Sequence, residues 1–419
     1  MSEPTTKALV PALRFPEFRD AGEWKERKLK QVCDINPKAS VLPDSFIYID
    51  LESVEAGVLL QKKAIQLEGA PSRAQRLLKN GDVIFQMVRP YQKNNYLFQP
   101  NDDFDYVAST GYAQLRAHQS NTYLYQYIHN ERFVDRVLEK CTGSNYPAIN
   151  SSDLAEIRLE IPQLEEQQKI ADCLSSIDEL VTAQTQKVEA LKAHKKGLMQ
   201  QLFPAEGETV PKLRFPEFRD TGEWNTCTLD EICSVSSGGT PSRSTSSFWN
   251  GNIPWITTTL IDINTINAAN EYISEEGLKN SAAKIFPKNT ILMAMYGQGK
   301  TRGKVAILGI DAAINQACAA ITLKKGFDTN FVFQNLAARY DEIRDISNKG
   351  GQENLSAGLI KGIPFTYPDV KSKEQQKIAD CLSSIDDLIT AQAHKLEALK
   401  AHKKGLMQQL FPAVDEVAG

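Results

Sequence analysis

An internal repeat constrains this 419-residue chain more than any other feature. Residues 166–205 recur as 374–413 with 35 of 40 positions identical, and the octapeptide LRFPEFRD of residues 13–20 recurs as 213–220. A period near 200 residues is too long for a solenoid and fits a duplicated half-molecule. We therefore predict an internal pseudo-two-fold repeat, by the logic that makes dimers symmetric.

The longer repeat has the pattern of a coiled-coil helix. In each copy, eight of ten positions spaced alternately four and three residues apart are apolar, and no proline interrupts the run. This period predicts that the two copies pair as an antiparallel coiled coil, with a bundle helix as the alternative. The predicted seam residues are Ile170, Leu174, Ile177, Val181, Val188 and Leu191, then Ile378, Leu382, Ile385, Ile389, Leu396 and Leu399.

Polar residues interrupt this seam at equivalent positions, Gln184 and Lys195 in the first copy and Gln392 and Lys403 in the second. Polar seam residues usually fix the register of a coiled coil. A helix of about 38 residues is roughly 55–60 Å long, so the pair could hold two domains a fixed distance apart. The first long repeat leads directly into the motif at 213–220, whereas the second long repeat is not followed by a copy of that motif. We therefore expect the motif at 13–20 to lie near the end of the second long repeat.

The two blocks between the repeats look unlike in sequence but share an order of elements. Strands are expected at 80–88 and 106–111 and a helix at 123–141, against strands at 289–296, 304–308 and 312–323 and a helix at 330–347. The predicted class is α/β, with two mixed α/β domains separated by two long helices. The expected segments are a motif (1–24), a first domain (25–163), a central helix (164–204), a linker motif (205–224), a second domain (225–372) and a distal helix (373–412).

Charge and cysteine content exclude several classes of protein. A net charge of −4 excludes a uniformly basic nucleic-acid binder but not local contact with DNA. Seven cysteines without a CxxC pair predict neither a zinc site nor a disulfide framework. We therefore expect no bound metal and a cytoplasmic location. The most apolar stretch, 305–323, contains Asp311, Asn315 and Gln316, so we expect no membrane span.

Loops that combine aromatic, amide and basic side chains are the candidate DNA contacts, because these groups suit base edges and phosphates. The alternative for each loop is an ordinary solvated turn or connector. Gly299-Lys300-Thr301 resembles the end of a phosphate-binding P-loop, but the required earlier glycine is Ala294. The candidates are Arg89, Tyr91, Gln92, Lys93, Asn94, Ser144 and Asn145 in the first domain, and Thr240, Ser242, Arg243, Thr258, Tyr296, Gln298, Lys300, Thr301 and Arg302 in the second.

Motifs of the common catalytic classes are missing from the sequence. It contains no GxSxG, no HExxH and no GxGxxG after a strand. We therefore predict no catalytic residues.

The architecture resembles the specificity subunit of Type I restriction-modification systems. The resemblance rests on the two unlike blocks, the repeated helices with EQQKIA at 166–171 and 374–379, and the elements GGTPS (238–242) and IPWI (253–256). It implies two target recognition domains, each reading half of a bipartite site in double-stranded DNA, with the helices as spacer. The first block departs from the pattern, since it lacks a GGTP loop near its start.

The resemblance also implies partners and no cofactor for the chain itself. Two methyltransferase subunits would carry S-adenosylmethionine, and two ATP-driven restriction subunits, with Mg²⁺, would cleave. The leading hypothesis is a non-enzymatic DNA-recognition subunit. The alternatives are a stand-alone DNA-modifying enzyme with fused recognition domains and a coiled-coil scaffold that reads no DNA.

Overall fold

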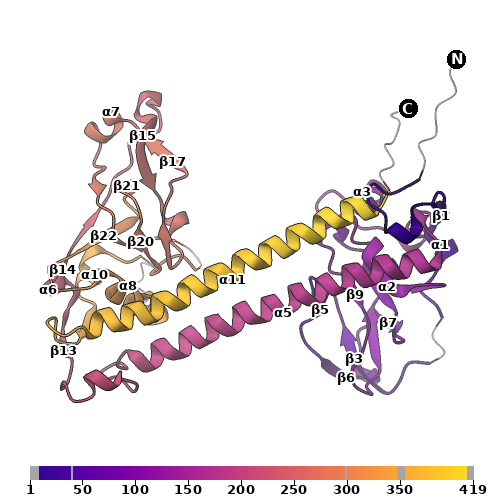
Figure 1. The fold of residues 1–419 in the computed structure, drawn as a ribbon, viewed down its shortest axis with the longest axis horizontal. Coiled ribbons are helices and arrows are strands. Elements are labelled where there is room, and N and C mark those ends of the chain that lie inside the picture. Colours follow the sequence, from indigo (N-terminus) through magenta and orange to yellow (C-terminus); the bar gives the residue numbers. More distant parts are fainter. Residues whose placement is uncertain (1–8, 39–40, 298–299, 347–353, 413–419) are drawn as a thin grey trace. The chain divides into compact units, whose positions relative to one another are not determined.

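The computed structural model describes residues 9–38, 41–297, 300–346 and 354–412 and divides into two compact units (Figure 1). The first unit comprises residues 1–185 and 394–419, and the second comprises residues 186–393. Both long helices, α5 (Leu164–Leu202) and α11 (Glu374–Leu410), contribute part of their length to each unit. No helix in the described part of the chain is long and apolar enough to cross a bilayer.

The first unit contains two four-stranded sheets. One has the order β2-β11-β8-β9, and the other has the order β6-β3-β10-β7 with β3 and β10 parallel. Small pairs β1–β12 and β4–β5 complete the unit. The strands are β1 (Lys25–Lys28), β2 (Cys33–Ile35), β3 (Ser45–Ile49), β4 (Val54–Glu55), β5 (Val58–Leu59), β6 (Lys63–Gln66), β7 (Ala74–Leu77), β8 (Val83–Gln86), β9 (Tyr96–Leu97), β10 (Tyr106–Ser109), β11 (Tyr112–Ala117) and β12 (Arg158–Ile161).

The second unit repeats this plan and adds one edge strand, β16, beside β20. Its sheets have the orders β14-β22-β19-β20-β16 and β17-β15-β21-β18, with β15 and β21 parallel, and β13 pairs with β23. The strands are β13 (Asn225–Thr228), β14 (Cys233–Ser237), β15 (Trp249–Ile256), β16 (Asn264–Ile266), β17 (Glu271–Ile273), β18 (Ile285–Phe286), β19 (Ile291–Ala294), β20 (Val305–Leu308), β21 (Ala312–Ile314), β22 (Cys318–Leu323) and β23 (Pro364–Tyr367).

The prediction of one fold in both blocks is confirmed by this topology. The central strands β8 and β19 are buried at every residue, and each pairs antiparallel with the strand that follows the parallel pair, β11 or β22. A buried run of Val, Ile, Phe, Leu or Met supplies the same packing in both units, so the two sequences can differ elsewhere without changing the fold.

The single helix predicted in each block is wrong, because two shorter helices take its place. In the first unit they are α2 (Asn121–Tyr127) and α3 (Glu131–Glu139), and the Asn130 side chain accepts a hydrogen bond from the Arg132 N–H and so begins a new helix. In the second unit they are α8 (Thr329–Ala338) and α9 (Tyr340–Ile346). The remaining short helices are α1 (Leu29–Val32), α4 (Ser151–Ala155), α6 (Leu229–Ile232), α7 (Glu275–Lys279) and α10 (Ala357–Lys361).

The predicted seam of each long helix is its least exposed stripe. All twenty seam positions, including the polar ones, are buried or partly buried. In the first unit Ile170 and Leu174 share a core with Leu410, and in the second unit Ile378 and Leu382 share a core with Leu202. Within each unit the start of one long helix therefore packs near the end of the other. The coiled coil along the full length remains a prediction.

The short repeated motif closes the end of a long helix in each unit. The Leu13 N–H donates to the Gln409 carbonyl (2.9 Å), and the Leu213 N–H donates to the Gln201 carbonyl (2.9 Å). Residues 13 and 409 therefore lie together, as the order of the repeats predicts.

A buried ion pair anchors the same motif to the start of the other long helix. Arg14 binds both carboxylate oxygens of Glu166 at 2.7 Å, and Arg214 binds Glu374 in the same way. The carboxylate side chains are 1% exposed. Bidentate pairs of this kind fix orientation as well as adding charge-assisted hydrogen bonds.

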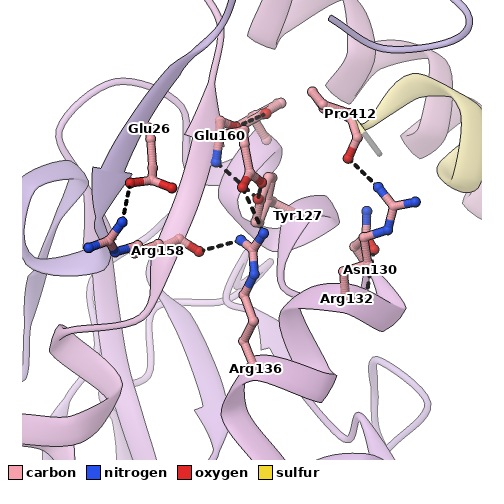
Figure 2. A network of polar contacts seen from close by, with 9 residues as sticks. Glu26, Tyr127, Asn130, Arg132, Arg136, Arg158, Glu160 and Pro412 are labelled. Atoms are coloured by element: carbon pink, nitrogen blue, oxygen red, sulfur yellow. Dashed lines mark hydrogen bonds and ion pairs between the residues drawn. The ribbon is translucent and has the colours of Figure 1, made fainter. Parts of the chain in front are cut away.

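Within the first unit, a further polar network connects α3 and β12 to the segment that follows α11 (Figure 2). Arg132 of α3 donates to the Pro412 carbonyl, and Arg136, one turn later, donates to Glu160 of β12 at 2.8 Å. The hydroxyl of Tyr127 donates to the other oxygen of Glu160, which is buried. The α2–α3 corner is therefore anchored both to β12 and to the segment that leaves α11.

Candidate nucleic-acid interface

In the second unit, three of the predicted DNA-contacting segments meet beside the ends of strands. Thr258 follows β15, and the Asn315 N–H after β21 donates to the Ile256 carbonyl at 2.9 Å. The Thr240 hydroxyl donates to the side chain of Gln316, the next residue. The N–H of Met295, just before Tyr296, donates to the Ala317 carbonyl. Parallel neighbours β15 and β21 end on the same side, which is why these loops converge.

The two glycines of the GGTPS element serve close packing of the backbone. A Cβ at Gly238 would lie 1.9 Å from the Ile314 carbonyl oxygen, and one at Gly239 would lie 2.4 Å from Ala282. The Gly239 N–H already donates to the Ile314 carbonyl (2.9 Å). The N–H of Gly239 is therefore engaged inside the unit.

Arg243 is held between aromatic rings and a carboxylate. Its guanidinium lies 3.7 Å from the centre of the Trp249 ring and 5.1 Å from that of Trp255. It also donates two hydrogen bonds to Glu271, at 2.5 and 3.1 Å. These bonds raise the pKa of Arg243 and lower the pKa of Glu271. The result is an exposed, oriented cation whose charge is partly balanced.

The other two predicted contacts near this edge are Ser242 and Thr258. Ser242 is exposed, and its hydroxyl lies 2.8 Å from that of Ser244. Thr258 is partly buried at the start of a 3₁₀ turn. Both carry hydroxyl groups near the surface, and the Ser242 carbonyl accepts a hydrogen bond from the indole N–H of Trp249 (3.0 Å).

The side chains of the loop after β19 differ in how exposed they are. Tyr296 is 40% exposed and Lys300 is exposed, whereas Arg302 is only 4% exposed. The Tyr340 hydroxyl of α9 donates to the Lys300 carbonyl (2.6 Å), and Thr301 is partly buried. Arg302 therefore differs from the expected exposed contact, because its side chain packs into the unit. Gln298 lies outside the described residues.

In the first unit, two predicted loops lie against each other. The Arg89 N–H donates to the Pro147 carbonyl (2.7 Å), and the Arg89 guanidinium lies 4.2 Å from the centre of the Tyr146 ring. Tyr146 is 63% exposed, and its neighbours Ser144 and Asn145 are exposed. Like Arg243, Arg89 is thus oriented by an aromatic ring at the surface.

The backbone of the loop after β8 is unusual at two of its basic residues. Arg89 and Lys93 have φ values of 54° and 55°, in the left-handed region that non-glycine residues seldom adopt. Such strain is found where surrounding contacts fix it, often at functional sites. Here Lys93 is fixed by an ion pair to Glu131 (3.0 Å) and a hydrogen bond to the His129 carbonyl.

The amides of this loop serve partly as its scaffold. Gln86 donates to Gln92 (2.9 Å), and its own oxygen accepts from the Asn94 N–H (3.2 Å). The Asn94 oxygen accepts from the Ala56 N–H. Tyr91, which is 50% exposed, is the large side chain that this scaffold leaves at the surface.

Sequence reasoning missed the residues that orient the arginines and Thr240. Glu271 and Gln316 come from segments distant from Arg243 and Thr240, and only the fold brings them together. A signal existed for Trp249 alone, as an aromatic residue six positions after Arg243 in a polar loop.

The duplicated architecture is matched by a family profile. The profile of the Type I restriction modification DNA specificity domain matches residues 21–193 and again residues 221–401. The chain belongs to this family. It therefore contains two specificity domains, one around each set of candidate contacts described above.

Individual relatives are specificity subunits. The MjaIX specificity subunit of Methanocaldococcus jannaschii is 30% identical over 206 residues, 46% of each chain. The EcoR124I/EcoR124II specificity subunit of Escherichia coli is 30% identical over 170 residues, 40% of this chain and 41% of that protein. Each match thus spans less than half of the relative's length.

Solved structures share the fold over nearly the whole chain. The S subunit of a Type I restriction-modification system from M. genitalium aligns with a TM-score of 0.61 at 15% identity, covering 97% of this chain and all of that one. A chain from a study of assembly and conformational transition of the type I R-M system aligns with a TM-score of 0.57 at 20% identity, covering 93% and 98%. The predicted fold class, with its two mixed α/β domains, is confirmed.

Among the residues that the structure describes, no group of three or more His, Cys, Asp or Glu side chains is placed to hold a metal ion.

Proposed function

We propose that this chain is the DNA-recognition subunit of a Type I restriction-modification complex and catalyses no reaction itself. The first reader (residues 25–163) and the second reader (residues 225–372) would each contact one half of a bipartite site in double-stranded DNA. The long helices would set the distance between the halves. Two half-sites on one face of B-DNA have centres about 34–36 Å or a multiple apart, a distance that helices of this length can span.

One observation carries the proposal: apart from the additional edge strand β16 in the second, the two readers share one strand order but present different side chains at equivalent strand ends. After β8 the first reader presents Arg89, stacked on Tyr146, and Tyr91. After the equivalent β19 the second presents Tyr296 and Lys300. A scaffold that did not read sequence would need no such difference, whereas two readers of different half-sites would.

Partners would supply the chemistry. Two methyltransferase subunits would bring S-adenosylmethionine, and two restriction subunits would bring ATP and Mg²⁺. The names of the relatives, all specificity subunits, support this division of labour. Such a complex would act on DNA in the cytoplasm.

Selection from a random DNA library tests the proposal. The full chain in complex with its methyltransferase partner should enrich one motif with two defined halves and a fixed spacer. Methyl transfer by the purified chain alone would favour the enzyme alternative. A complex that binds DNA without enriching any sequence would favour the scaffold alternative.

A further inference from the structure

Each unit contains a three-residue polar contact that joins both long helices to a reader. In the first node, Lys403 of α11 lies 2.6 and 2.7 Å from the two oxygens of Asp178 in α5, and Gln126 of α2 donates to the same carboxylate at 2.8 Å. In the second node, Lys195 of α5 lies 2.7 Å from both oxygens of Asp386 in α11, and Gln334 of α8 donates to that carboxylate at 2.7 Å.

The two nodes are copies of one arrangement. Each of their three residues lies 208 positions from its counterpart, and the lysine always comes from the long helix that does not carry the aspartate. Lysine and aspartate belong to the repeated helices, so their recurrence follows from the duplication. The recurrence of the glutamine does not follow from the repeated helices, because Gln126 and Gln334 lie in the readers, whose sequences are otherwise unlike.

Both glutamine side chains are buried at an energetic cost. Gln126 and Gln334 are each 1% exposed. Within the described part of the structure the amide oxygen of each is buried and accepts no hydrogen bond. An unsatisfied buried carbonyl destabilises a fold, yet both readers keep it. The N–H bond to the aspartate is the contact that both side chains share, and Gln126 also donates to Ser175 of α5 (3.5 Å).

Each node pairs a polar seam residue, Lys195 or Lys403, with a carboxylate, and polar seam residues usually fix register. An apolar seam tolerates slippage by whole turns, whereas a lysine that must meet one carboxylate does not. A slip of one turn would displace a reader by about 5.4 Å along the helix. That exceeds the rise of one base pair, about 3.4 Å.

We infer that the two nodes hold each reader at one position along the long helices and thereby determine which spacer length between half-sites is accepted. The inference rests on the proposed function. Gln126, Asp178 and Lys403, with Gln334, Asp386 and Lys195, are thus positioning residues that touch no base. Their loss should alter the choice of spacer and leave the choice of bases intact.

The first test needs no DNA. Amide hydrogen exchange is measured on the full chain for wild type, Asp178→Asn and Asp386→Asn. Asp178→Asn should raise the exchange of α2 at least fivefold and leave α8 unchanged, and Asp386→Asn should do the reverse. Glu397→Gln, which removes an exposed ion pair to Lys400 on the same helix, is the control and should change neither.

The second test uses the methyltransferase complex and duplexes that carry the same two half-sites with spacers one base pair shorter, unchanged and one base pair longer. Wild type and Glu397→Gln should favour one spacer, and Asp178→Asn should lower that preference at least fivefold with the same half-site sequence. Unchanged spacer preference together with unchanged α2 exchange would overturn the inference, as would an altered half-site. If even wild type selects no half-sites, the proposed function fails, and the exchange result alone decides whether the nodes position the readers.

Discussion

At the residue scale, the two readers use the same device to present a cation. Arg89 lies over Tyr146 and Arg243 lies over Trp249, with ring distances of 4.2 and 3.7 Å. Stacking restricts each guanidinium, and the two hydrogen bonds to Glu271 orient that of Arg243 further. The sequence alone predicted the arginines but not their pairing with these rings or with Glu271, because that pairing is set by the fold.

Replacing Arg243 with alanine should weaken binding at the second half-site by ~1–3 kcal/mol, the range for a lost base contact, and leave the first half-site unaffected. Binding of the methyltransferase complex to duplexes with either half-site scrambled measures this. Lys279→Ala, at another exposed cation of the second unit, is the control and should have little effect. Equal weakening at both half-sites would show that Arg243 acts on the fold and not on DNA.

His129 predicts a pH dependence of stability. Burial lowers its pKa to about 4, and its Nδ1 lies 2.7 Å from the Tyr125 carbonyl. In the unfolded chain the pKa of histidine is about 6.5, so between these values only the unfolded state takes up the proton. Stability should therefore fall as the pH drops from about 6.5 to 4, by roughly 2–3 kcal/mol from this group.

Denaturant unfolding of wild type and His129→Gln at pH 7 and pH 5 checks this dependence. The variant should lose less stability than wild type on acidification. The same loss in wild type and His129→Gln would contradict the assignment.

At the scale of elements, periodic and buried segments could be predicted and breaks in helices could not. The long helices and the strands near β8 and β19 follow from apolar patterns that the fold uses directly. The α2–α3 corner depends on the cap at Asn130, one residue in a run that otherwise reads as helix. The buried pairing of Arg14 with Glu166 joins segments some 150 residues apart, beyond the reach of local patterns.

The buried ion pair between Arg14 and Glu166 predicts a large loss of stability when the carboxylate is removed. Glu166→Ala leaves the Arg14 guanidinium buried without its carboxylate and should destabilise the first unit by ~3–5 kcal/mol. Glu17→Ala, which breaks the exposed pair with Lys169 in the same motif, should leave the unfolding midpoint unchanged. Denaturant unfolding compares the two variants, and similar midpoints would contradict an anchoring role for Arg14 and Glu166.

At the scale of the whole molecule, duplication with divergence accounts for the chain. The repeated helices and motifs keep the contacts that close each unit, and the readers keep their strand order while their exposed loops differ. The sequence predicts this plan because 35 of the 40 positions in the long repeat are identical. It cannot predict the bases recognised, since base choice depends on the placement of side chains such as Arg89, Arg243 and Tyr296.

Mapping of methylated adenines in the genome of the host, with and without this chain, tests the central claim most directly. The account predicts that deleting the chain abolishes methylation at one bipartite motif, and that exchanging residues 225–372 for those of another specificity subunit changes only one half of that motif. Methylation that persists at the same sites after deletion, or an exchange that changes both halves together, would contradict it.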